Sequence, residues 1–242
     1  MFKFSAPLSD GARSHLLQVY SLLTVGVLTA ALFCYADMHY THLGGMTTAI
    51  GGAILFGLAR SGSLDNETGS AVFLIASGLE GMALSPLVHT AAVYYPQALT
   101  TAFLSSIAVF VSFSIAALVA RRREFFFLSG ILATVTSYLA LASLVNLVVG
   151  SSVMMDFQLY GGLVVFMGYI LLDTQVMIDR FESGFNRTNI VRPACDLFAD
   201  LVAVFIRLLI ILMKKAEKPA NRKSSLTAVS SPDRKYYKRQ VD

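Results

Sequence analysis

Six long apolar runs follow one another along the chain, separated by short polar connections. They cover Leu16–Ala36, Leu43–Ala59, Ser70–Val88, Leu99–Ala120, Phe125–Val145 and Met154–Ile178. Each run approaches the roughly 20 apolar residues that an α-helix needs to cross the hydrocarbon core of a bilayer. A seventh apolar segment, Cys195–Met213, carries charges where a lipid-facing helix would be apolar. The pattern predicts an all-α membrane protein with six to seven transmembrane helices in one bundle.

Composition agrees with a chain whose solvent is lipid. Of its 242 residues, 55% are hydrophobic and only 14% are charged, whereas an ordinary soluble domain carries about 25% charged residues. The connections between runs are too short to form a separate soluble domain. The predicted organisation is a cytosolic N-terminal segment (1–15), a transmembrane bundle (16–213) and a basic disordered tail (214–242).

Basic residues fall in alternate connections and so predict the orientation. They are Lys3 and Arg13, Arg60, Arg121–Arg123, and Arg180, Arg187 and Arg192, while 37–42, 89–98 and 146–153 contain no Arg or Lys. Because cytosolic loops are rich in Arg and Lys, these connections and the N-terminus are predicted to be cytosolic. The basic tail favours a cytosolic C-terminus as well, which requires Cys195–Met213 to be a re-entrant or half-crossing helix. The alternative is a full crossing, with the tail tolerated on the opposite side.

Small residues recur every four positions in the second run. Gly45, Ala49, Ala53 and Gly57 form a stripe on one helix face. Such stripes let helices approach closely inside a membrane. We expect a neighbouring helix to pack on this stripe.

Charged residues at membrane depth are the candidates for function. A charge at the bilayer centre costs about 2.5–3.5 kcal/mol on insertion scales, so such residues usually face the protein interior and serve a function. The apolar segments contain Glu80, Asp173, Asp196, Asp200 and Arg207. Glu80 has small or apolar neighbours and no local basic partner, which favours a place on an ion path over a packing role.

The acids of the last two segments are expected at similar depth. Asp196 and Asp200 are four residues apart and Arg207 follows seven later, so the three share one helix face. The connection between Asp173 and Asp200 starts and ends on the same membrane side, so their helices are antiparallel. Either the two carboxyl groups meet and share a proton, or each is solvated separately at the cytosolic interface, or Asp200 pairs with Arg207.

Several motifs resemble those of the Bax inhibitor-1 family, the transmembrane Bax-inhibitor-motif proteins. The motifs are Arg13-Ser14-His15-Leu16-Leu17-Gln18-Val19-Tyr20, Leu128-Ser129-Gly130-Ile131-Leu132, Leu172-Asp173-Thr174-Gln175 and Cys195-Asp196-Leu197-Phe198-Ala199-Asp200-Leu201. The resemblance extends from about residue 12 to residue 215. It implies a multi-pass protein of the endoplasmic reticulum membrane that protects against stress-induced cell death and lets calcium leak in a pH-dependent way. It also implies seven helices, with the last one surrounded by the others.

The resemblance also implies roles for individual residues. Asp173 and Asp200 match the family's pH-sensing and gating pair, and as carboxylates they are the candidate calcium ligands. The candidates for the ion path or for tuning the pair are Glu80, Asp196, Arg60 and Arg207. No cofactor is implied beyond calcium as the transported ion. The implied partners are the lipid bilayer, calcium ions and apoptosis-regulating membrane proteins, and nucleic acid is not among them.

Other classes of function fit the sequence less well. The chain has neither a His-Glu-x-x-His motif nor a paired Gly-x-Gly-Asp motif, so we do not expect an enzyme. A proton-coupled cation transporter would also use buried acids, but no internal repeat with matching broken helices is visible. A non-conducting interaction protein that regulates apoptosis remains the main alternative.

Overall fold

The computed structural model describes residues 10–120, 124–184 and 188–229, with side chains described up to 217. These residues form seven α-helices, one π-helical turn and no strand, which confirms the predicted all-α class. Lys3, Arg121–Arg123, Arg187 and residues 230–242 lie outside the described part. The elements are α1 (Asp10–Ala36), η1 (Asp37–Thr41), α2 (Met46–Arg60), α3 (Asn66–Tyr94), α4 (Pro96–Val119), α5 (Leu128–Val149), α6 (Ser152–Ser183) and α7 (Val191–Val229).

Five stretches of the described chain are long and apolar enough to span a membrane. They are Asp10–Thr41, Asn66–Tyr94, Pro96–Val119, Leu128–Val149 and Ser152–Ser183. The second predicted run folds into α2, which has 15 residues and is therefore roughly 22 Å long, less than the core thickness of about 30 Å. Helix α2, which was predicted to span the membrane, is therefore shorter than a helix that crosses it fully.

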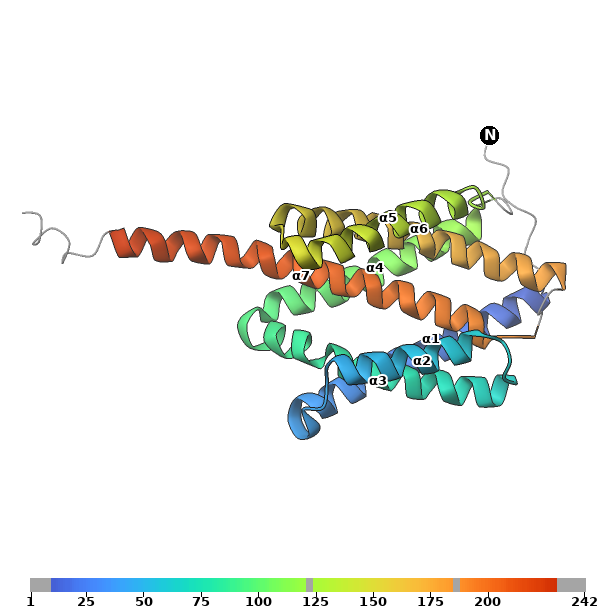
Figure 1. Ribbon diagram of the computed structural model, residues 1–242. Helices are drawn as coiled ribbons and strands as arrows, with labels where there is room; N and C mark the ends of the chain where they lie inside the picture. Colours follow the sequence, from blue (N-terminus) through green and yellow to red (C-terminus); the bar gives the residue numbers. More distant parts are fainter. Residues whose placement is uncertain (1–9, 121–123, 185–187, 230–242) are drawn as a thin grey trace, which may run out of the picture.

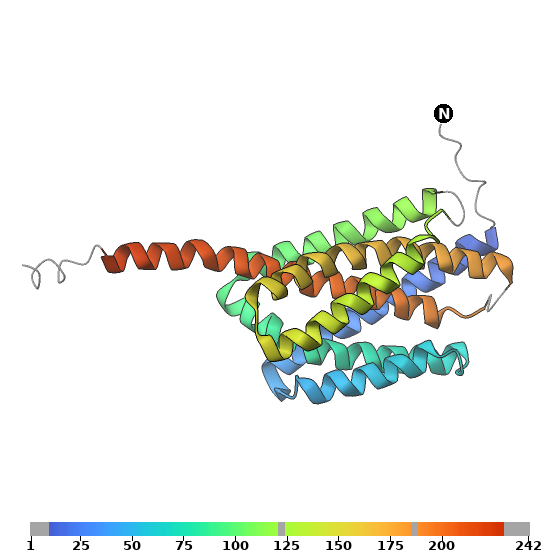
Figure 2. The same ribbon diagram turned by 45° about the horizontal axis from the view of Figure 1, so that its top comes forward.

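The bundle consists of two groups of three helices with α7 between them. In the first group α3 packs against both α1 and α2, and in the second α6 packs against both α4 and α5. Helix α7 packs against α1, α2, α3, α4 and α6, and Figures 1 and 2 show it running through the middle of the bundle. The predicted central position of the last helix is confirmed.

Helix starts are fixed by local capping signals. The Asp65 side chain accepts the Thr68 backbone N–H at 3.1 Å and caps α3, and hydrogen bonds from Thr68 lower the pKa of Asp65. The Ser151 hydroxyl accepts the Met154 backbone N–H at 3.4 Å at the start of α6. Such caps satisfy N–H groups that have no partner within their own helix. Both helices therefore begin a few residues before the apolar runs that predicted them.

Close helix contact occurs at glycines other than the predicted stripe. A Cβ at Gly81 of α3 would overlap the backbone carbonyl of Ala30 in α1, so only glycine permits the observed separation. Around Gly45 and Gly57, by contrast, no atom lies within 4 Å of where a Cβ would be. The prediction that a helix packs on the stripe is wrong, because α3 meets α2 at Gly51 and Gly52 instead.

Helix α7 passes along the whole bundle. It begins at the end where α1 begins, called here the N-terminal end, and projects beyond the opposite or far end (Figure 1). There Lys214 Nζ donates to Asp156 Oδ1 at 2.7 Å, near the start of α6. A helix that runs the length of the bundle favours the alternative of a full crossing over a re-entrant segment, while the side of the tail remains a prediction.

Part of the segment predicted to be a disordered tail is helical. Helix α7 continues to Val229, so residues 214–229 are helical. Lys214, Lys215, Ala216 and Glu217 are all residues that favour helix, and the Lys214–Asp156 ion pair holds the first of them against α6. These local preferences outweigh the charge that suggested disorder.

Because α1 begins at the N-terminal end of the bundle and α7 projects beyond the far end, we expect the two termini on opposite sides of the membrane. In sealed microsomes with either an N-terminal or a C-terminal epitope, we expect external protease to remove one epitope and spare the other. The measurement is an immunoblot before and after detergent is added. Loss of both epitopes without detergent would contradict the full crossing of α7.

Candidate functional site

The start of α7 is fixed beside the start of α3. Asn189 Oδ1 accepts the Arg192 backbone N–H at 3.0 Å and caps α7. Asn66 Nδ2 donates to the Thr188 carbonyl at 2.6 Å, and Asn66 Oδ1 accepts the Ile190 N–H at 3.3 Å. These bonds position the first turns of α7, which carry the candidate acids.

Asp173 of α6 and Asp200 of α7 meet inside the bundle. Their carboxyl groups lie within hydrogen-bonding reach of each other, and Asp200 is 4% exposed. Asp200 Oδ2 accepts no hydrogen bond among the described residues, and the Thr174 hydroxyl, next to Asp173 in the chain, has no partner there either. The structure brings together the two acids that the sequence placed at similar depth, while their role remains a prediction.

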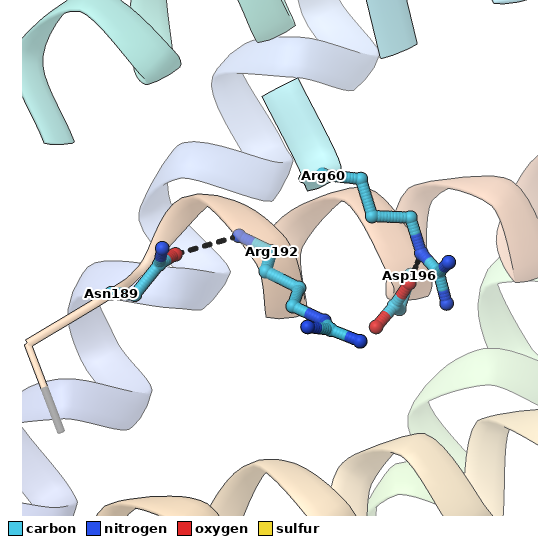
Figure 3. Close-up of polar contacts among 4 residues, drawn as sticks. All are labelled: Arg60, Asn189, Arg192 and Asp196. Atoms are coloured by element: carbon cyan, nitrogen blue, oxygen red, sulfur yellow. Dashed lines mark hydrogen bonds and ion pairs between the residues drawn. The ribbon is translucent and has the colours of Figure 1, made fainter. Parts of the chain in front are cut away.

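Asp196 is bound by a base from another helix. Arg60, at the end of α2, donates from Nε to Asp196 Oδ1, and Figure 3 shows its side chain reaching α7 one turn beyond Arg192. The Asp196 side chain is 12% exposed. The ion pair joins α2 to α7 one turn before Asp200.

Arg207 does not pair with Asp200, so that alternative is wrong. Its Nη1 donates to the Ala203 carbonyl at 3.0 Å, and its guanidinium lies 4.3 Å from the centre of the Phe166 ring. Gly162 of α6 leaves the space, because a Cβ there would lie 2.5 Å from Arg207 Nε. The charge is held by a backbone carbonyl and an aromatic face.

Two further arginines face the same acids and were counted from the sequence only as loop charges. Arg180 interacts electrostatically with Asp173, Asp196, Arg60 and Arg192. Arg180 follows Asp173 by seven residues and Arg192 precedes Asp196 by four, spacings that put each base on the same helix face as its acid. This spacing could have identified both arginines from the sequence as neighbours of the acids.

Glu80 lines a cavity of about 450 Å³ that we call the Glu80 cavity. Its carboxylate makes no hydrogen bond or ion pair among the described residues. Gly52 of α2 leaves room for it, since a Cβ there would lie 2.9 Å from Glu80 Oε1. The lining comes from α2, α3 and α7: Ala53, Phe56, Gly57, Arg60, Glu80, Phe198, Ala199, Val202, Ala203, Ile206 and Arg207. The cavity therefore extends along α2 and α7 from Glu80 to Arg60, which pairs with Asp196.

No resident metal site is visible in the described part of the chain. It contains no group of three or more His, Cys, Asp or Glu side chains that could hold a metal ion. Calcium prefers six to eight oxygen ligands, more than Asp173 and Asp200 supply. Calcium binding by this pair remains a prediction, in which the ion is cargo that passes through.

Known proteins similar to this chain share nearly its whole length. The profile of the family "Inhibitor of apoptosis-promoting Bax1" matches residues 12–217. Bax inhibitor 1 of Homo sapiens is 34% identical over 229 residues, covering 92% of this chain and 95% of the relative. Bax inhibitor 1 of Arabidopsis thaliana is 33% identical over 212 residues, covering 86% and 84%. The chain is a multi-pass membrane protein that belongs to the Bax inhibitor 1 family.

Proposed function

We propose that this protein is a pH-sensitive calcium leak channel of the endoplasmic reticulum membrane that protects against stress-induced cell death. The names of its relatives, Bax inhibitor 1, support the protective role. The meeting of Asp173 and Asp200 inside the bundle carries the pH-sensitive part. The Glu80 cavity supports the ion path.

The acid pair acts as one titrating unit. Two carboxyl groups within hydrogen-bonding reach form that bond only when one of them carries a proton. Both cannot ionise cheaply in a buried site, so the pair exchanges one proton with solution as the pH changes. One unit of charge then appears or disappears at the contact between α6 and α7.

This charge change acts on the three arginines of the N-terminal end. Loss of the shared proton strengthens the attraction that Arg60, Arg180 and Arg192 feel toward the acids, and draws α2 toward α6 and α7. Protonation weakens it and loosens the end of α2, where the Arg60–Asp196 pair closes the Glu80 cavity. The calcium leak therefore increases on acidification.

The Glu80 cavity provides the path within the membrane. Glu80 is the 15th of the 29 residues of α3, which places it near the middle of the bilayer. A cation at that depth loses hydration to apolar surroundings. A carboxylate without a protein partner stabilises it there by direct electrostatic attraction. The walls of α2 and α7 continue from Glu80 to Arg60.

Reconstitution tests the proposal directly. Purified protein in liposomes loaded with a calcium dye is expected to pass calcium down its gradient, and faster at pH 6 than at pH 8. Empty liposomes give the background. No flux above background at any pH would favour a non-conducting interaction protein, and flux against the calcium gradient driven by a pH gradient would favour a proton-coupled transporter.

Glu80→Gln is expected to lower calcium flux severalfold and to leave the pH midpoint unchanged, because it removes charge from the path and keeps the acid pair. Glu67→Gln is the matched control, an exposed acid in the first turn of the same helix. Flux is compared at equal amounts of reconstituted protein. Equal calcium flux in the two variants would mean that Glu80 serves packing and not the ion path.

A further inference from the structure

A second cavity, here called the lateral cavity, lies on another face of α7. Its volume is about 410 Å³, well above the roughly 150 Å³ of an apolar cavity that stays dry and binds benzene. Helices α1, α3, α4 and α7 line it, with Ala31, Tyr35, Leu84, Phe103, Leu201 and Phe205 among the residues. The proposed calcium path does not use it.

The lining offers almost nothing to a polar ligand. No charged residue contributes to it. Of its three lining hydroxyls, two are already engaged within α4, because Thr100 donates to the Pro96 carbonyl at 3.1 Å and Ser106 donates to the Phe103 carbonyl at 2.8 Å. The third belongs to Tyr35, whose side chain is exposed at the rim. Water or an ion inside the cavity would lose hydrogen bonds or hydration that the lining does not replace, so the occupant must be apolar.

The cavity is continuous with the surface that faces lipid. Three of its large hydrophobic lining side chains are exposed: Tyr35 (55%), Phe103 (48%) and Ile107 (41%). They lie on the stretches Asp10–Thr41 and Pro96–Val119, both apolar and long enough to span the bilayer. The molecules in contact with this rim are therefore the acyl chains of membrane lipids.

We propose that the lateral cavity is a binding site for an acyl chain of a membrane lipid. A void of this size would forfeit dispersion contacts along its walls, and a chain entering from the bilayer restores them without desolvating any polar group. The chain lies against Leu201 and Phe205 of α7 and against Leu84 of α3.

An acyl chain in the lateral cavity is also expected to affect the calcium path along the Glu80 cavity. This expectation rests on the proposed function. Phe198 and Val202 of α7 line both the lateral cavity and the Glu80 cavity, so α7 is the wall between them. Bulk in the lateral cavity supports α7 in its present position, beside the Arg60–Asp196 pair. Filling the cavity permanently is therefore expected to reduce the calcium leak.

The absence of tryptophan from the sequence allows a direct test. Phe205→Trp places a reporter in the lateral cavity, and Phe110→Trp places one in the core, where Phe110 is 7% exposed. In vesicles of phosphatidylcholine brominated in mid-chain, the Phe205→Trp variant is expected to lose most of its emission and the Phe110→Trp variant little. Adding Ala31→Phe fills the cavity and should restore the Phe205→Trp emission, whereas Ala133→Phe, on an exposed face of α5, should not.

Three results would contradict the proposal that the lateral cavity binds an acyl chain. They are equal quenching of the two reporters, quenching that Ala31→Phe leaves unchanged, and quenching that falls as protein density in the vesicles rises. The last would mean that a second copy covers the cavity. The same vesicles give calcium flux for Ala31→Phe and Ala133→Phe, and equal flux would overturn the coupling alone. Absence of flux in every variant would overturn the proposed function and leave the quenching result standing.

Discussion

Asp173→Asn and Asp200→Asn are each expected to flatten the dependence of calcium flux on pH. A gate that opens on binding one proton can change its flux by up to about tenfold per pH unit on the alkaline side of its midpoint, where the protonated form is rare. Each substitution removes one partner of the shared proton and leaves a neutral amide in its place. Since the amide resembles the protonated carboxyl group, both variants should show the high flux of the acid condition at every pH. The measurement is calcium entry into dye-loaded liposomes between pH 5.5 and pH 8.5.

The double substitution distinguishes a shared proton from two independent groups. If the acids act as one unit, the double variant shows the same flat pH dependence as either single variant, because no shared proton remains for the second change to remove. Asp65→Asn is the control. Asp65 is an exposed acid at the same end of the bundle, and asparagine caps a helix as well as aspartate does. Single variants that keep the wild-type midpoint would rule out the shared proton.

Helix positions could be predicted from the sequence because they depend on local properties. An apolar run long enough for the bilayer must satisfy its backbone internally, and a helix does so. The starts of α3 and α6 could also have been placed closely, since Asp65 and Ser151 are ordinary capping residues. The ends of helices outside the apolar runs were missed, above all in α7, where hydropathy stops at Met213 and the helix does not.

Partners of the buried charges could be predicted only in part. The antiparallel arrangement of α6 and α7 follows from one short connection, and this was enough to place Asp173 near Asp200. The pairing of Arg60 with Asp196 joins residues 136 positions apart and depends on how α2 lies against α7. Arg207 turns to Phe166 because Gly162 leaves space on α6. Spacing within one helix carries no information about such contacts.

Asp37 is the buried acid whose importance was not foreseen. In the sequence it marks only the polar end of the first apolar run, but it is 2% exposed. Its Oδ1 accepts the Thr41 hydroxyl at 2.6 Å and the Leu43 N–H at 2.7 Å. Its Oδ2 accepts the Gly44 N–H at 3.0 Å and the Ser85 hydroxyl. One carboxylate thus ties the turn after α1 to α3 at the far end of the bundle.

Asp37→Ala is expected to destabilise the protein by about 3 kcal/mol or more, since each buried donor left without an acceptor costs about 1–3 kcal/mol. The chain offers its own reporters, because Cys34 and Cys195 are both free and buried. Cys34 lies about one turn before Asp37 and Cys195 lies at the start of α7. Heating in detergent with a thiol-reactive fluorophore therefore measures the unfolding of each region separately in Cys195→Ser and Cys34→Ser backgrounds.

The order in which the two thiols react shows what Asp37 holds together. Its hydrogen bonds all lie at the far end of the bundle, so in Asp37→Ala the Cys34 thiol should react at a lower temperature than the Cys195 thiol. The control is Asp65→Ala, which removes an exposed helix cap worth about 1 kcal/mol and should lower both temperatures slightly and equally. If Asp37→Ala behaves like Asp65→Ala, then water replaces the carboxylate at little cost and the turn after α1 is held by the packing of α1 on α3 at Gly81. If Cys34 alone becomes reactive early, Asp37 is the group that fastens this turn to α3.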